Sequence, residues 1–284
     1  MYAVTGANGQ LGRLVIRQLI ARGVPPAQIA ALVRRPAQAA DLAALGVALR
    51  EADYDRPETL AAALAGVDRL LLISSSELGR RAPQHQAVID AARAAGVGFL
   101  AYTSLLRADR SPLGLAAEHV ATEAALRDSG LPHAILRHGW YTENYLASLP
   151  PALQHGAFIG AAGEGRIASA TRQDYAEADA AVLLAPPASG TVLELTGDEA
   201  YTLTEFAAEL SRQSGRSVPY VNLPQAEFEA ALAGAGLPAP LAALLADSDA
   251  GAAQSALFDG GRALSALIQR PTTPLAQAMA AALR

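Results

Sequence analysis

Two patterns of apolar residues alternate along the first half of the chain. Short runs rich in Val, Ile, Leu and Ala are separated by longer segments in which apolar residues recur every three to four positions. The first pattern predicts strands and the second predicts helices, as in residues 9–22, where Leu11, Val15 and Leu19 fall on one helix face. This alternation is typical of a parallel sheet wrapped by helices.

Six strand–helix cycles are predicted in this half. The strands are expected at residues 2–5, 29–33, 47–51, 69–73, 97–102 and 133–137. The helices are expected at residues 9–22, after Pro36, from Pro57, at residues 83–95 and at residues 115–128.

Near residue 150 the regular alternation stops and prolines separate shorter segments. Strands are expected at residues 192–195 and 218–221, and helices at residues 203–213 and 225–235. The predicted fold is therefore α/β. A Rossmann-type, doubly wound parallel sheet occupies residues 1–150, and a smaller, mostly helical C-terminal lobe at residues 151–284 is interleaved with it.

A glycine-rich turn joins the first expected strand to the first helix. Gly6, Gly9 and Gly12 have the G-x-x-G-x-x-G spacing, which permits a tight turn and brings a pyrophosphate close to the backbone at a helix N-terminus. An unrelated glycine-bearing turn is the alternative, and the six surrounding cycles favour a dinucleotide. The expected cofactor-binding residues of this turn are Gly6, Ala7, Asn8, Gly9, Gln10, Leu11 and Gly12.

The end of the second strand indicates which dinucleotide is bound. NAD-binding folds place a carboxylate there for the ribose hydroxyls, whereas this chain has Arg34 and Arg35 and no acidic residue before Asp41. Arginine suits a 2′-phosphate, so NADPH is predicted, with two solvent-facing arginines as the alternative. Residues 53–55 follow the third strand. Ser74, Ser75 and Ser76 follow the fourth, where they contact the cofactor or serve as loop and cap residues.

Composition narrows the chemistry. The 22 basic residues are all Arg, against 27 acidic residues, and the net charge of −5 disfavours nucleic acid as a partner. The chain has no Cys, which excludes disulfides and thiolate metal sites. The five histidines lack metal-ligand spacing, so no metal is expected, and His119 and Glu123, one helical turn apart, are read as a structural pair. With a strand expected from residue 2 and no apolar run long enough to cross a bilayer, a cytoplasmic protein without a membrane span is predicted.

The lack of lysine removes the Tyr-x-x-x-Lys pair with which many proteins of this shape reduce carbonyls. A quinone does not need that pair. Hydride addition to a quinone gives a phenolate-like oxygen whose conjugate acid has a pKa of about 10, while that of an alkoxide is nearer water's value of about 15.7. Water can therefore protonate the product, and holding the two reactants together supplies the catalysis.

Several segments together resemble the NmrA-like atypical short-chain dehydrogenases, and more narrowly the NAD(P)H:quinone oxidoreductase type 2 group. These segments are residues 5–12, 72–77, 101–106, 111–115, 139–145, 158–163, 245–249 and 270–273. The resemblance implies a cleft between the Rossmann domain and the C-terminal lobe that takes NADPH and a quinone without flavin.

The resemblance also implies site residues. Cofactor contacts map onto the glycine turn, Arg34, the three serines and a later segment consisting of His138, Gly139, Trp140, Tyr141, Thr142 and Glu143. His138 stands where relatives often carry Asn, and Asn8 where they often carry Thr. The backbone of residues 167–170, which includes Ala168 and Ser169, looks like the family's segment facing the nicotinamide and supplies part of the expected quinone slot together with Phe99 and Tyr102. In a quinone reductase, Tyr102 or Tyr141, with Asn144, is expected to orient the quinone oxygens.

Three functions follow as hypotheses. The first is an NADPH-dependent quinone reductase acting on a small molecule, with a homodimer as its candidate assembly. The second is a non-catalytic NADP(H) redox sensor of the NmrA type, since a dinucleotide fold does not by itself imply chemistry. The third is reduction of another conjugated acceptor, such as a dye.

Overall fold

The protein, described here over residues 1–284 by a computed structural model, is built around a seven-stranded sheet. The strand order is β3-β2-β1-β4-β5-β6-β8, and the five pairs from β3 to β6 are parallel. The strands are β1 (Tyr2–Val4), β2 (Ile29–Val33), β3 (Ala48–Glu51), β4 (Arg69–Leu72), β5 (Phe99–Leu105), β6 (His133–His138) and β8 (Thr191–Leu195). In this order the chain runs outward from β1 to β3 on one side and from β4 on the other, so the strand order reverses between β1 and β4, as in a doubly wound fold.

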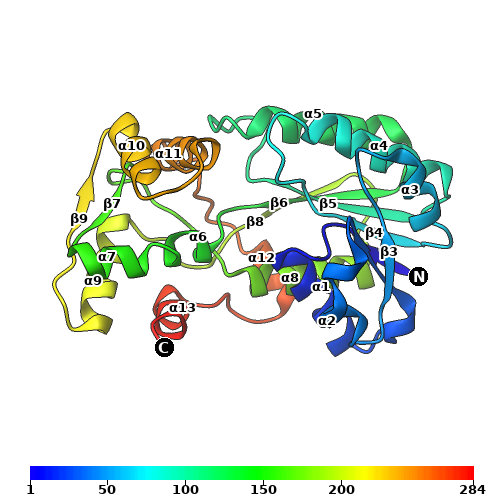
Figure 1. The fold of residues 1–284 in the computed structure, drawn as a ribbon, viewed down its shortest axis with the longest axis horizontal. Helices are drawn as coiled ribbons and strands as arrows, with labels where there is room; N and C mark the ends of the chain where they lie inside the picture. The colour runs from blue at the N-terminus through cyan, green and yellow to red at the C-terminus, as the bar shows by residue number, and fades with distance from the viewer. The chain divides into compact units, whose positions relative to one another are not determined.

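Helices cover both faces of this sheet (Figure 1). On one face lie α1 (Gln10–Ala21) and α8 (Arg172–Leu184), which contact each other. On the other lie α3 (Pro57–Ala63), α4 (Arg81–Ala94) and α5 (Ala116–Ser129). Short helical turns, η1 (Pro26–Gln28), η2 (Pro36–Gln38) and α2 (Ala40–Ala43), flank β2. Pro57 takes the first turn of α3, a position that needs no N–H donor.

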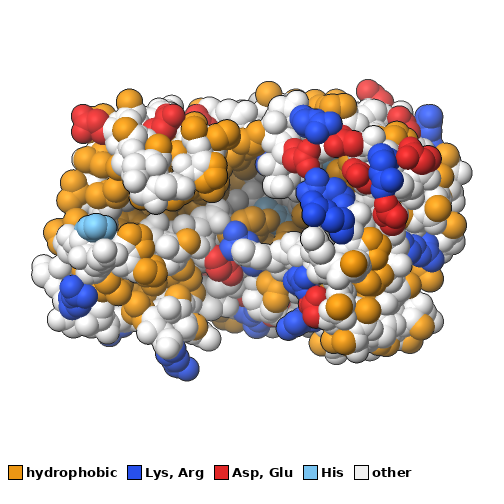
Figure 2. Space-filling view, viewed as in Figure 1, with side chains coloured by type: hydrophobic (Ala, Val, Ile, Leu, Met, Phe, Trp, Pro, Cys, Tyr) orange, Lys and Arg blue, Asp and Glu red, His pale blue; other side chains and the backbone are white.

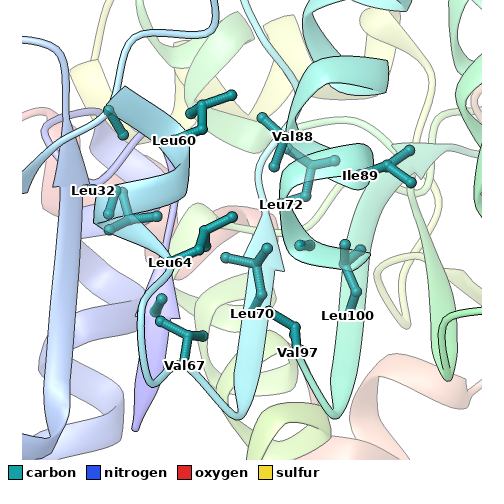
Figure 3. Close-up of a cluster of buried hydrophobic side chains, with 14 of the residues drawn as sticks. Leu32, Leu60, Leu64, Val67, Leu70, Leu72, Val88, Ile89, Val97 and Leu100 are labelled. Carbon is teal, nitrogen blue, oxygen red and sulfur yellow. The ribbon is translucent and has the colours of Figure 1, made fainter. Parts of the chain in front are cut away.

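The core beneath α3 and α4 is aliphatic. Leu70 and Leu72 of β4 and Leu100 of β5 point toward Leu64, which follows α3, and Val88 of α4 (Figure 3). Each of these five side chains is buried. Because both faces of the sheet are covered, β2 and β5 are buried along their whole length and β4 is buried after Arg69, rather than at every second residue.

The chain divides into two compact units by its internal contacts. Unit 1 consists of Met1–Ala108, Ala117–His138 and Arg172–Leu193, and unit 2 of Asp109–Ala116, Gly139–Thr171 and Glu194–Arg284. The predicted division was residues 1–150 and an interleaved lobe at residues 151–284, whereas unit 1 also contains α8 and unit 2 also contains residues 109–116 and 139–150. The prediction that the expected strand at residues 192–195 belongs to the C-terminal lobe is wrong, because β8 is the seventh strand of the main sheet, next to β6.

Unit 2 combines a small sheet with short helices. Its two parallel strands are β7 (Phe158–Gly160) and β9 (Tyr220–Asn222). Its helices are α6 (Thr142–Leu146), α7 (Leu149–His155), α9 (Leu203–Ser214), α10 (Gln225–Gly234), α11 (Ala239–Ala253), α12 (Ala263–Ile268) and α13 (Leu275–Ala282). A capping box starts α9, with Thr202 and Glu205 each accepting a backbone N–H of the other.

None of the helices combines the length and apolar character needed to cross a membrane.

Candidate functional site

The glycine turn between β1 and α1 has the geometry that its spacing predicts. Gly6 has a φ of +56°, in the left-handed region that glycine adopts without strain. A Cβ on Gly12 would lie 2.6 Å from the carbonyl oxygen of Gly6 and 2.7 Å from Cα of Ala7, so only glycine lets α1 approach the turn this closely. The first turn of α1 has no acidic residue and no side-chain N-cap, which suits an anion. These residues fit a dinucleotide pyrophosphate.

A loop next to this turn, at residues 73–76, is held by buried polar side chains. The backbone N–H of Ile73 donates to Oγ1 of Thr5, that of Ser74 to Oγ1 of Thr103, and that of Ser75 to Nε2 of His85, each at 2.9 Å. His85 is fully buried, and burial lowers its pKa to about 4, so it stays neutral and can accept. Thr103 and His85 thus place Ser74 and Ser75, and Thr5 holds the residue before them, three roles that the spacing of the sequence did not indicate.

Two arginines lie at the same carboxyl edge of the sheet. Arg34 follows β2, and its NH1 is 2.6 Å from Oε1 of Glu77. Arg13, in the first turns of α1, donates from Nε to the carbonyl of Asn8 at 2.9 Å and from its guanidinium to the Asn8 side chain, and it pairs with Asp41. Arg34 is a predicted cofactor residue, and Arg13, directly after Gly12, lies beside the same turn without having been predicted.

Tyr102 does not line an open surface. Its side chain is fully buried in the core of unit 1, and its hydroxyl lies 2.8 Å from Nδ1 of His119. Burial raises the pKa of Tyr102 and lowers that of His119 to about 3, so both stay neutral. The prediction that Tyr102 orients a quinone is at odds with this placement, because the side chain has no exposed surface and its hydroxyl is engaged by His119.

Phe99 likewise lies away from the glycine turn. It is the first residue of β5 and pairs with Arg69 at the start of β4, which is the amino edge of the sheet. The glycine turn lies at the carboxyl edge, where ligands bind in open α/β sheets. Phe99 therefore lies at the opposite edge of the sheet from the glycine turn, and this placement does not support its prediction as a quinone contact.

His138 ends β6 in a buried polar cluster. Its Nε2 lies 2.9 Å from Oδ1 of Asp179 on α8, and its ring stacks on Tyr175 at 4.4 Å between centroids. Asp179 is fully buried, with 0% of its surface exposed to solvent. His138 is thus fixed at the carboxyl edge, but by α8, an element that the sequence analysis did not expect in unit 1.

A buried ion pair lies between α5 and β6. Arg137 donates to Glu123 from Nε at 2.9 Å and from NH2 at 2.7 Å, and the Ser104 hydroxyl donates to the same carboxylate at 2.6 Å. Glu123 is 1% exposed. The prediction that Glu123 has a structural role fits this geometry, although its partner is Arg137 and not His119.

In unit 2, the two segments predicted to face the nicotinamide and the quinone lie side by side. Tyr141 forms a parallel bridge with Ala170, and the N–H of Thr142 donates to the Ala170 carbonyl at 2.9 Å. Hydroxyls continue the contact: Oγ1 of Thr142 is 2.8 Å from Oγ of Ser169, which is 2.7 Å from the Tyr201 hydroxyl. Tyr141 and Asn144 are half-buried beside this chain.

The backbone of residues 167–170 is largely engaged inside unit 2. The N–H groups of Ile167, Ala168 and Ala170 donate to Tyr201, Leu257 and Trp140, and Ala168 is 1% exposed. These three N–H groups are therefore not available to a quinone, and any contribution of this segment to a quinone slot has to come from its side chains.

A buried carboxylate lies deeper in unit 2. Asp249 of α11 accepts from the Tyr145 hydroxyl at 2.9 Å and from the N–H of Ala161 at 2.9 Å. Burial raises its pKa to about 6, and burial also raises the pKa of the nearby Tyr145. This carboxylate joins α6, β7 and α11.

No cluster of three or more His, Cys, Asp or Glu side chains in the structure could hold a metal ion.

Comparison with known proteins extends these observations along the chain. A family model described as NAD(P)H-binding matches residues 6–186. Quinone oxidoreductase 2 of Escherichia coli (strain K12) is 59% identical over 279 residues, covering 98% of this chain and 97% of the relative.

Solved structures show the same similarity over nearly the whole chain. The NADPH-dependent quinone oxidoreductase QOR2 of Escherichia coli, complexed with NADPH, is 58% identical and superposes with a TM-score of 0.97 over 100% of both chains. Triphenylmethane reductase of Citrobacter sp., complexed with NADP(H), is 36% identical with a TM-score of 0.95, covering 99% of this chain and 100% of that one.

Proposed function

Because this chain belongs to the NAD(P)H-binding family, and within it to the family of quinone oxidoreductase 2, we propose that it reduces quinones with NADPH. The observation that carries the proposal is the extent of the likeness, which covers both units and not the glycine turn alone. The Rossmann-type sheet and the fit of the glycine turn to a pyrophosphate support it.

Residues of unit 1 bind the cofactor in this proposal. The backbone N–H groups of the first turn of α1 receive the pyrophosphate, and the close contact between Gly12 and Gly6 keeps that surface free of side chains. Arg34 binds the 2′-phosphate, and the Ser74–Ser76 loop, held by Thr5, Thr103 and His85, forms the neighbouring wall. The Arg13 guanidinium adds positive charge beside Asn8.

When bound, NADPH supplies a hydride to the quinone. The chain provides no Tyr-x-x-x-Lys pair, because it has no lysine. None is needed, since a phenolate-like product has a conjugate acid with a pKa of about 10 and takes its proton from water. Tyr141, Asn144 and Ser169 of unit 2 orient the quinone oxygens, and the segment from His138 to Glu143 borders the nicotinamide. Tyr102 and Phe99 have no role in this site, because Tyr102 is fully buried and Phe99 lies at the amino edge of the sheet.

The reaction can be tested directly. Purified protein whose spectrum shows no flavin should oxidise NADPH, followed at 340 nm, only when a benzoquinone or naphthoquinone is present. Tight NADPH binding without turnover on any quinone would instead identify a redox sensor and would overturn the proposal.

Arg34→Ala tests the cofactor assignment. Loss of a charge-assisted contact to the 2′-phosphate should weaken NADPH binding about tenfold or more, at about 1.5–3 kcal/mol, and leave NADH binding nearly unchanged. Arg93→Ala is the matched control, because Arg93 is an exposed arginine in the last turn of α4 and its loss changes the net charge equally. An unchanged preference for NADPH in Arg34→Ala would remove Arg34 from the site.

Conjugated dyes are a second acceptor class, favoured by the 36% identity to a triphenylmethane reductase over nearly the full chain. Triphenylmethane dyes and quinones should be compared at equal NADPH by kcat/KM.

A cytoplasmic location and a homodimeric assembly complete the proposal. Cell fractionation tests the first, and sedimentation of the purified protein tests the second.

A further inference from the structure

One ion pair at the carboxyl edge of unit 1 joins two strands that are not neighbours. Arg34 follows β2 and Glu77 lies in the loop after β4, and their side chains meet at 2.6 Å. In the sheet, β1 lies between these two strands: Val4 pairs with Ala31 of β2 and with Leu71 of β4. Because adjacent strands are about 4.8 Å apart, the pair bridges about 10 Å across the end of β1, where the glycine turn begins.

The Glu77 carboxylate is the fixed member of the pair. Its Oε2 accepts from Nε2 of Gln84 at 2.9 Å, and Gln84 is 4% exposed. The Glu77 N–H donates to Oγ of Ser75 at 3.1 Å, and NH1 of Arg80 lies 3.4 Å from Oε2. Glu77 is therefore held by the loop and by α4, whereas the Arg34 side chain is 59% exposed and only Glu77 holds it in place.

A second bridge braces this arrangement. Arg80 also reaches Asp55, after β3, at 2.9 Å, and Nε2 of Gln84 lies 3.2 Å from the same Asp55 oxygen. The loops after β2, β3 and β4 are thus linked by alternating charges. Figure 2 shows arginine and acidic side chains lying close together on the surface of unit 1.

We propose that Glu77 limits the preference for NADPH over NADH. Its carboxylate pairs with Arg34 across the end of β1 and so competes with the 2′-phosphate for that side chain. This inference rests on the proposed function, in which Arg34 binds that phosphate. An exposed ion pair contributes little to stability, so Arg34 leaves Glu77 readily. Once it has left, the Glu77 carboxylate still repels the phosphate, and both effects weaken NADPH binding relative to NADH.

The test is Glu77→Gln, which keeps an oxygen for Gln84 and removes the charge. Affinities for NADPH and NADH are measured by calorimetry, without turnover. We expect the Kd of NADPH to fall about three- to tenfold and that of NADH to change less than twofold, with the NADPH effect smaller at high salt because exposed charges are screened. In an Arg34→Ala background, Glu77→Gln should lose the part of its effect that comes from competition for Arg34 and keep the part that comes from repulsion of the phosphate, so its effect should be smaller than in the wild-type background.

Asp68→Asn is the matched control, because Asp68 pairs with Arg69 at 3.4 Å at the amino edge of the same sheet and its loss changes the net charge equally. Weaker NADPH binding in Glu77→Gln would mean that Glu77 positions Arg34 for the phosphate, and it would overturn the inference. Equal tightening of NADPH and NADH, or no change, would overturn it as well. Failure of the wild-type protein to bind NADPH or to reduce quinones would instead refute the proposed function.

Discussion

The carboxyl edge of unit 1 and the interior of unit 2 use polar groups in opposite ways. At the edge, the glycine turn offers backbone N–H groups, and Arg34 and Glu77 are partly exposed. In unit 2, Asp249 is 3% exposed and its carboxylate is satisfied by Tyr145 and Ala161. The first arrangement leaves donors for a ligand, whereas the second uses its donors to join α6, β7 and α11. Buried polar groups therefore hold unit 2 together, and exposed ones in unit 1 are available for binding.

The largest expected effect is a loss of unfolding free energy with rising pH, caused by the buried carboxylate in unit 2. Burial raises the pKa of folded Asp249 to about 6 from an ordinary 3.8, so the folded protein holds this proton more tightly than the unfolded chain. The contribution of Asp249 to the free energy of unfolding should therefore fall as pH rises from about 4 to 6, by about 3 kcal/mol in total. Asp249→Asn should lack this fall.

Denaturant unfolding of both proteins between pH 4 and 7 provides the measurement. The difference between wild type and variant isolates Asp249, because all other carboxylates are common to both. If the unfolding free energies of wild type and Asp249→Asn changed in parallel with pH, the Asp249 carboxylate would not change its charge in this range.

The next effect acts on the edge of unit 1. In Gly12→Ala, the new Cβ would meet backbone atoms of Gly6 and Ala7, which cannot rotate away. We expect a loss of about 1–3 kcal/mol in unfolding free energy and at least a tenfold rise in the Kd of NADPH. Gly234→Ala at the end of α10 is the control, because nothing lies within 4 Å of its Cβ position. Wild-type affinity in Gly12→Ala would show that the close approach is not needed.

The smallest effect sharpens the distinction between a buried polar group and a site residue. Tyr102→Phe removes the hydroxyl that meets His119 and should lower the unfolding free energy by about 1 kcal/mol. Its kcat/KM for quinones should stay within twofold of wild type, while Tyr141→Phe should lower it. Steady-state kinetics decide this, and a strong loss of turnover in Tyr102→Phe would restore the first interpretation of that residue.

The local parts of the fold could be predicted because their signals are local. Helix α1, the Pro57 start of α3 and strand β2 follow from apolar spacing and from the conformational limits of proline and glycine. The site residues that could be predicted are those whose role depends on the backbone next to them, as at Gly6 and Gly12. Strand β8 could not be assigned to its sheet, because alternation along a segment does not say which strand it pairs with.

By itself, the sequence determined the alternation of strands and helices, the glycine turn and the exclusion of lysine and cysteine chemistry, since each depends on residue type or short spacing. Only the tertiary structure decided that Tyr102 is buried against His119, that α8 fixes His138, and that Glu77 meets Arg34 across β1. In each of these pairs the partners lie 17 to 43 positions apart in the chain. Contacts over such separations are set by how the strands are ordered in the sheet, which the spacing of neighbouring residues does not encode.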